Sequence, residues 1–81
     1  MPSKDLITTI LSIDSEKSMR EFLQGILTPQ EIVEINRRLK IVQMLKAGIA
    51  QREIAEKLEV GIATVSRGSR EIKQGRFSMV K

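Results

Sequence analysis

The sequence contains no cysteine, no histidine, no tryptophan and no tyrosine. Without cysteine, the chain has neither a disulfide nor a thiolate zinc site to stabilise it. Without histidine, it lacks the commonest general base and the commonest metal ligand. Its two phenylalanines are too few to form the aromatic platforms on which single-stranded nucleic acid stacks. The sequence also has no glycine-rich phosphate loop and no paired-carboxylate site, so we expect a protein that is not an enzyme and binds no metal.

Long apolar runs are absent too. No segment approaches the length of a membrane span, and residues 1–11 lack the basic head of a signal peptide. We therefore expect a cytoplasmic protein with no membrane partner. A chain of 81 residues makes one domain at most and buries only a small core. We expect a single domain over residues 1–81 that gains stability from a partner subunit.

The net charge of +4 is concentrated near one end of the sequence. Residues 1–60 carry nine basic and nine acidic side chains, whereas residues 61–81 carry five basic side chains and one acidic side chain. Such a distribution is typical of a protein that binds a polyanion. A basic, solvated tail is the alternative explanation.

Apolar residues recur at helical spacing along the chain, and no segment alternates as a strand does. We expect Ser3 to cap a first helix, and Asp14 or Ser15 to cap a second one. Gly25 is the expected stop of the second helix, because glycine tolerates the left-handed geometry of a helix end.

The clearest helix start is Thr28-Pro29-Gln30-Glu31, which fits a capping box with proline at the first helical position. A long helix is expected from there to about Ala47, with Gly48 ending it. Its apolar stripe is wide, which indicates a central helix packed on more than one side. The stripe comprises Ile32, Ile35, Leu39, Ile41, Val42, Met44 and Leu45.

Two short helices complete the chain. Gln51 to Leu58 is the first, and Ile62 to about Gln74 is the second, closed by Gly75; Arg76 to Lys81 shows no clear structure. Two short helices joined by a three-residue turn describe a helix-turn-helix. The expected fold is therefore all-α, with about five short helices and a helix-turn-helix over residues 51–74. The expected contacts within this motif come from Ile54, Ala55, Leu58, Val60 and Val65.

The second helix of the motif begins with compact side chains, which allow a helix end to enter the major groove. In the turn, Gly61 is expected to adopt the left-handed backbone angle, since Glu59 occupies the position where such turns often have glycine. Gly68, inside the helix, costs roughly 1 kcal/mol relative to alanine and indicates a close approach to the backbone. The expected DNA-binding residues are Gln51, Arg52, Ile62, Ala63, Thr64, Ser66, Arg70 and Lys73.

The segment Gly61-Ile62-Ala63-Thr64-Val65-Ser66-Arg67-Gly68-Ser69 resembles the recognition-helix motif of the tryptophan (Trp operon) repressor family. The resemblance covers Leu27 to Lys73. It implies an intertwined homodimer that binds L-tryptophan as a corepressor and then a double-stranded DNA operator, with no resident cofactor. The other segments that carry it are Gln51-Arg52-Glu53-Ile54, Arg38-Leu39-Lys40-Ile41-Val42 and Leu27-Thr28-Pro29.

The resemblance also implies a set of tryptophan-binding residues. Arg38 and Arg67 match the two arginines that hold the indole between them, and Arg67 would pair with the ligand carboxylate. Taken without the family, the favoured interpretations are that Arg38 is a solvated helix residue and Arg67 a phosphate contact; the family resemblance reverses that preference. The remaining implied ligand-binding residues are Leu27 and Thr28 through their backbone carbonyls, Gly68 against the ligand, Ile41 and Val42 near the pocket, and Glu71.

The sequence departs from the family pattern at two residues and at its end. Glu71 stands where the family has a small hydroxyl residue near the ligand amino group. A carboxylate there is able to pair with the ammonium, to pair with Arg67, or to reject the zwitterion. Gly25 stands where a larger residue lines the pocket. The family's further C-terminal helix has no counterpart here, so dimerisation is expected to rest on the first three helices.

The expected function is sequence-specific transcriptional repression, with L-tryptophan as corepressor. One alternative is a ligand-independent helix-turn-helix regulator or a transposase-type DNA-binding subunit. Another is a helical module that binds only proteins. The last alternative predicts no duplex binding, whereas phosphate contacts predict an affinity that falls steeply with salt.

Overall fold

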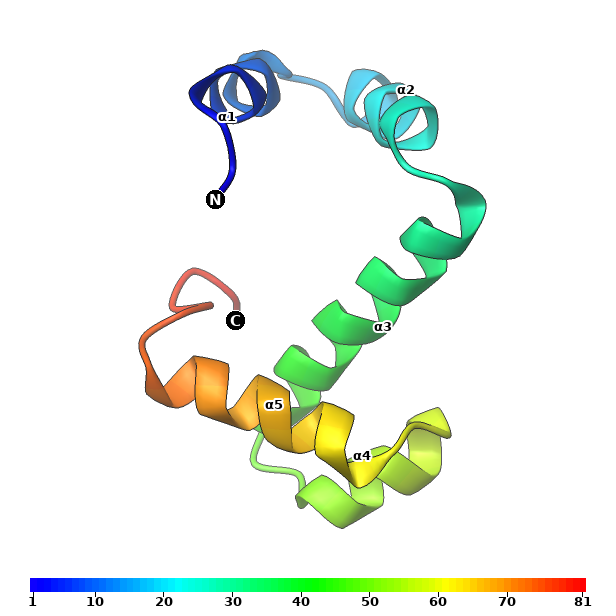
Figure 1. The fold of residues 1–81 in the computed structure, drawn as a ribbon, viewed down its shortest axis with the longest axis vertical. Coiled ribbons are helices and arrows are strands. Elements are labelled where there is room, and N and C mark those ends of the chain that lie inside the picture. Colours follow the sequence, from blue (N-terminus) through cyan, green and yellow to red (C-terminus); the bar gives the residue numbers. More distant parts are fainter. The chain divides into compact units, whose positions relative to one another are not determined.

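The computed structural model describes all residues 1–81 and contains five helices and no strand (Figure 1). The prediction of an all-α fold with five helices is confirmed. None of the helices has both the length and the apolar character needed to cross a membrane. The chain divides into two units, Met1–Ile32 and Val33–Lys81; the single domain predicted over residues 1–81 stays a prediction. The helices are α1 (Lys4–Ser12), α2 (Glu16–Ile26), α3 (Pro29–Lys46), α4 (Gln51–Leu58) and α5 (Ile62–Lys73).

The first three helices begin with side-chain caps. The hydroxyl oxygens of Ser3 and Ser15 each accept a hydrogen bond from the amide three residues later, at 3.0 and 3.1 Å. At the start of α3 the capping box is complete: the Thr28 amide donates to Glu31 Oε1 at 2.8 Å, and the Glu31 amide donates to Thr28 Oγ1 at 3.1 Å. These caps satisfy amides that helix geometry leaves unpaired, and they confirm the predicted starts.

The first unit buries none of its residues and leaves several apolar side chains exposed. No residue of α1 or α2 is buried. Leu11 is 79% exposed and Ile26 is 56% exposed. In α3, which continues into the second unit, Val33, Ile35 and Leu39 are also exposed. The apolar stripes found in the sequence are therefore present in the helices. Within one chain, however, no residue of α1 or α2 is buried by them.

Helix α2 does not stop at Gly25, so that prediction is wrong. The helix continues to Ile26, and Leu27 is the first extended residue, with φ −110° and ψ 146°. The backbone angle of Gly25 lies outside the left-handed region. Helix α2 ends because the chain must be extended where it enters the Thr28 capping box and Pro29.

The second unit contains the core of the chain. Ile41 and Met44 of α3 pack with Ile54 of α4 and Val65 of α5, and the last two side chains are fully buried. Helices α4 and α5 pack against each other, and both meet the C-terminal part of α3 (Figure 1). The predicted inward residues of the helix-turn-helix are confirmed. The partly buried residues around this cluster are Leu45, Ile49, Ala55, Leu58 and Val60.

The turn between α4 and α5 uses a different residue from the one predicted. Glu59 is left-handed, with φ 55° and ψ 46°, whereas Gly61 has an ordinary φ of −67°. The left-handed residue has to be the first one after α4, because only there does it turn the next amides back onto the helix. The amides of Glu59 and Val60 reach the carbonyls of Glu56 and Ala55 at 3.4 and 3.1 Å.

Residues beyond α5 are structured, although none of Arg76 to Lys81 was predicted to be. Gly75, with φ 90°, ends the helix as predicted. The following residues form turns, and Lys46 at the end of α3 donates hydrogen bonds to the carbonyl oxygens of Phe77 and Val80. This short tail is therefore attached to α3.

Candidate functional site

A pocket of about 240 Å³ lies between α3 and α5. This volume is just below the range of about 300–1,000 Å³ usual for small-molecule sites, so the pocket suits a small ligand such as an amino acid. Ile41 and Val42 give it a buried apolar wall, being 2% and 3% exposed, whereas its two arginines are exposed. The residues that line it are Arg38, Ile41, Val42, Thr64, Arg67, Gly68 and Glu71.

The pocket brings together six of the eight residues that the family resemblance implies for the ligand. It also includes Thr64, which was assigned to DNA. The other two residues, Leu27 and Thr28, belong to the first unit, so their part in ligand binding stays a prediction. Because both arginines reach one pocket, an anionic group is the chemistry that the pocket favours.

Gly68 sets how closely α5 approaches α3. A Cβ atom placed on Gly68 would lie 3.3 Å from Ile41 Cγ2 and 3.4 Å from Leu45 Cδ1. The close approach predicted from this mid-helix glycine is therefore made by the side chains of α3. Since Gly68 also lines the pocket, a larger residue at this position would change the spacing of the two helices that form it.

Glu71 is already paired. Its Oε2 atom lies 2.9 Å from Arg76 Nε, and its side chain is 32% exposed. Arg67, one turn earlier on α5, forms no ion pair. The sequence left the partner of Glu71 open between a ligand ammonium and Arg67, and the structure pairs it with Arg76 instead. The glycine helix end at Gly75 is the sequence signal that predicts this pair, because such an end returns the next residue toward the last turn of the helix.

The start of α5 is exposed and uncapped. Ile62 is 50% exposed, and Ala63 and Thr64 are exposed beside it. No side chain caps α4 or α5, and the first turn of α5 has no acidic residue. Unpaired amides at a helix start, together with the helix dipole, bind phosphate groups. In this respect α4 and α5 differ from the three capped helices before them.

A hydrogen bond joins the two helices of the motif. Ser66 Oγ donates to Gln51 Oε1 at 2.8 Å. Ser66 is half-buried, so its main partner in the chain is Gln51 and not solvent. Because the bond occupies the amide oxygen, the two N–H groups of Gln51 remain available as donors at the first residue of α4.

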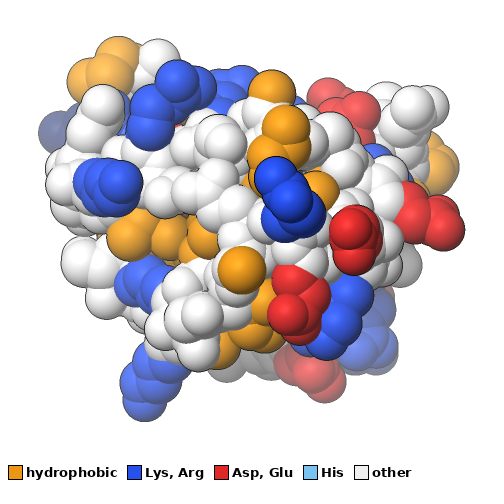
Figure 2. Space-filling view, turned by 90° about the horizontal axis from the view of Figure 1, so that it is seen from below, with side chains coloured by type: hydrophobic (Ala, Val, Ile, Leu, Met, Phe, Trp, Pro, Cys, Tyr) orange, Lys and Arg blue, Asp and Glu red, His pale blue; other side chains and the backbone are white.

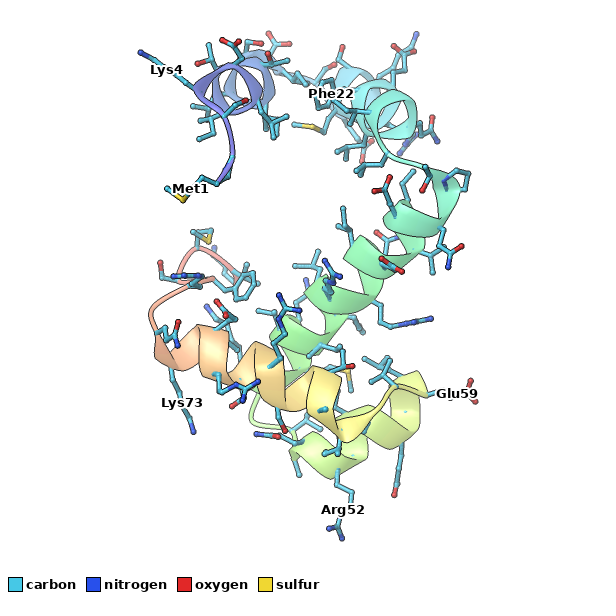
Figure 3. All side chains as sticks on the ribbon, in the orientation of Figure 1. Met1, Lys4, Phe22, Arg52, Glu59 and Lys73 are labelled. Carbon is cyan, nitrogen blue, oxygen red and sulfur yellow. The ribbon has the colours of Figure 1, made fainter.

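Basic side chains lie around the same surface. In Figure 3, Arg52 of α4 and Lys73 of α5 point toward the same side of the second unit, and Glu59 lies at the turn away from both. Figure 2 shows Lys and Arg side chains spread over this face, whereas Asp and Glu gather on one side of it. Arg70 is also exposed. No group of three or more acidic side chains is placed to hold a metal ion.

Comparison with known proteins agrees with the family resemblance. Residues 3–79 match the family described as Trp repressor protein. The chain is 40% identical to a Trp operon repressor homolog of Vibrio parahaemolyticus over 63 residues, which are 76% of this chain and 60% of that protein. It is also 40% identical to a homolog of Actinobacillus succinogenes over 68 residues, 83% of this chain and 67% of that protein.

A third relative, the Trp operon repressor homolog of Pasteurella multocida, is 44% identical over 55 residues, 67% of this chain and 54% of that protein. The chain thus spans about 60% of the length of the first relative. No solved structure matches the chain significantly. The match over nearly all of its residues shows that this chain belongs to the Trp repressor family.

Proposed function

We propose that this protein is a DNA-binding transcriptional repressor that uses L-tryptophan as its corepressor. The observation that carries the proposal is that one helix, α5, has an exposed, uncapped start and also forms one wall of the pocket with Arg38 and Arg67. A ligand in the pocket therefore contacts the same helix that would enter the DNA. The named relatives, all Trp operon repressor homologs, support the same function.

The DNA contact would be made by α5 and the start of α4. The exposed Ile62, Ala63 and Thr64 offer apolar and hydroxyl groups to base edges, including thymine methyl groups. The uncapped amides, the donors of Gln51 and the basic side chains of Arg52, Arg70 and Lys73 suit phosphate oxygens. Arg67 is the residue most able to serve both the pocket and the phosphates.

A homodimer explains the exposed apolar residues of the first unit. Leu11 and Ile26 are exposed to water, which is unfavourable for apolar side chains. Their burial against a second copy would stabilise both chains. Helix-turn-helix dimers, the Trp repressor among them, are known to place two recognition helices about 34 Å apart, in successive major grooves of a palindrome.

Tryptophan would act by binding one arrangement of α3 and α5 better than others. Its carboxylate would pair with the arginines, and its indole would lie against Ile41 and Val42. A ligand shifts a conformational equilibrium only by its difference in affinity between the states, and DNA must then tighten tryptophan binding by the same factor. Couplings of this kind are typically about 5–150-fold.

The test is fluorescence anisotropy with a labelled palindrome of the tryptophan-operon type, over a salt series, with and without L-tryptophan. We expect affinity to fall steeply with salt, by about 0.9 logarithmic units per tenfold salt for each phosphate contact, and to rise at least about fivefold with tryptophan. A duplex of scrambled sequence is the control. An affinity for the duplex that does not change with salt would contradict the proposed DNA binding.

Arg67→Ala tests whether α5 contributes to both DNA binding and tryptophan binding. It should weaken operator binding and, measured by calorimetry, tryptophan binding as well, each by about tenfold for one lost charge-assisted contact. Lys17→Ala, which changes an exposed basic residue of α2, should leave both affinities unchanged. Operator binding that is identical with and without tryptophan would favour the ligand-independent regulator instead.

A further inference from the structure

Helix α5 ends in a way that brings Arg76 back to Glu71. The amide of Gly75 donates to the carbonyl of Ile72, and the amide of Arg76 donates to the carbonyl of Glu71, both at 3.0 Å. With the positive φ of Gly75, these bonds form a Schellman motif. In that motif the side chain after the glycine usually makes an apolar contact with the helix. Here the contact is an ion pair between Arg76 and Glu71.

Arg67, the other basic residue within reach of Glu71 on α5, does not compete with Arg76 for it. Arg67 and Glu71 are four residues apart on α5, a spacing at which opposite charges attract. The two do not pair. The order matters, because the acidic residue first is the more stable arrangement. The two i,i+4 pairs that form in the chain, Glu16 with Arg20 and Glu53 with Lys57, both have that order.

The tail keeps Arg76 in position. On one side of Arg76, Gly75 fixes the chain to the end of α5. On the other side, the Lys46 ammonium at the end of α3 donates to the carbonyl of Val80 at 2.6 Å and also to the carbonyl of Phe77. The backbone of Arg76 is therefore held between two attached segments, and its side chain, 63% exposed, reaches Glu71 from a fixed starting point.

We propose that Arg76 is a positioning residue that makes the pocket selective for a zwitterionic α-amino acid. By holding Glu71 through Oε2, it orients Glu71 Oε1 as an acceptor for the ligand ammonium, while Arg67, which forms no ion pair, remains available to the ligand carboxylate. The inference rests on the proposed function, because it takes the ligand to be tryptophan in its zwitterionic form. Without Arg76, Glu71 would lose the contact that orients it, while Arg67 would still be available to the ligand carboxylate.

The experiment is calorimetric titration of the full chain with three related probes. L-tryptophan carries both charges, indole-3-propionate lacks the ammonium, and tryptamine lacks the carboxylate. For the unaltered protein we expect tryptophan to bind about tenfold more tightly than either analogue, which corresponds to one charge-assisted contact. A wild-type protein that binds tryptophan and indole-3-propionate equally overturns the inference.

Variants then separate positioning from mere structure. Arg76→Ala should weaken tryptophan about fivefold to tenfold and leave indole-3-propionate within twofold, while Arg76→Lys restores most of the preference. Glu71→Gln should bind indole-3-propionate more tightly than the wild type, because it removes a negative charge beside the carboxylate. Lys81→Ala, a basic residue of the same tail without a side-chain contact in the chain, is the matched control and should change nothing.

The possible failures are distinct. If Arg76→Ala weakens both indole carboxylates equally, Arg76 only supports the fold of the pocket and the inference is wrong. If the wild type binds neither compound, both the corepressor part of the proposed function and the inference are wrong. Operator binding by the same proteins without ligand then reports separately on the DNA-binding part.

Discussion

The two units of this chain have apolar stripes of similar kind, but only one of them buries its stripe. Every buried side chain lies in the second unit, where α3, α4 and α5 meet at Ile54 and Val65. The first unit has helices with well-formed caps and no buried residue. Local signals are therefore enough to form α1 and α2, whereas the burial of their apolar surface against a second copy stays a prediction.

The largest effect is expected from a substitution in the core of the second unit. Ile54→Ala should lower the free energy of unfolding by about 2–4 kcal/mol, because it removes a fully buried side chain and leaves a cavity. Urea denaturation followed by circular dichroism measures this loss. A loss below about 1 kcal/mol would show that the cluster around Ile54 is not the core that stabilises the chain.

The next prediction concerns the first unit. Leu11→Ala should weaken self-association by about tenfold, because burying a leucine side chain contributes about 1.5–3 kcal/mol and alanine keeps only part of it. Sedimentation equilibrium over a range of protein concentrations gives the dimer dissociation constant, and Lys17→Ala serves as the control. A wild type that remains monomeric at high concentration would contradict the predicted homodimer.

A smaller effect is expected where the two helices of the motif are joined. Ser66→Ala and Gln51→Ala should each weaken operator binding about fivefold, since a hydrogen bond contributes about 1 kcal/mol. The double variant should be no weaker than either single one, because Ser66 would act by orienting Gln51. Additive losses in the anisotropy titration would mean that the two residues contact DNA separately.

The smallest effect is a gain in stability at the turn. Glu59→Gly should raise the free energy of unfolding by about 0.5–1 kcal/mol, because a non-glycine residue in the left-handed region costs about 1–2 kcal/mol and glycine loses part of that gain to unfolded-state entropy. Thermal unfolding measures the shift. Gly61→Ala is the control: its φ is ordinary and nothing lies within 4 Å of the added Cβ, so it should not destabilise the protein.

Features that depend on neighbouring residues could be predicted from the sequence. The capping box at Thr28 and the helix end at Gly75 are set by interactions within a few residues, and both are confirmed. Two predictions based on glycine were wrong: the helix end at Gly25 and the left-handed residue at Gly61. Glycine permits the left-handed conformation without requiring it, and at the turn the position of the helix end required it of Glu59 instead.

Contacts between distant residues could not be predicted in the same way. The hydrogen bonds of Lys46 to the tail join residues more than thirty positions apart, and no periodic pattern contains them. The gathering of Arg38, Arg67 and Glu71 in one pocket was accessible only through the family resemblance. Their binding of tryptophan, the part of Leu27 and Thr28, and the homodimer stay predictions.

The pocket between α3 and α5 has one practical consequence. No aromatic side chain lines it, and the whole chain contains neither tryptophan nor tyrosine. An indole ligand would therefore be the only strong fluorophore in the complex. Its own emission maximum would shift toward the blue as it leaves water for the side chains of Ile41 and Val42, so occupancy of the pocket can be followed without attaching any dye.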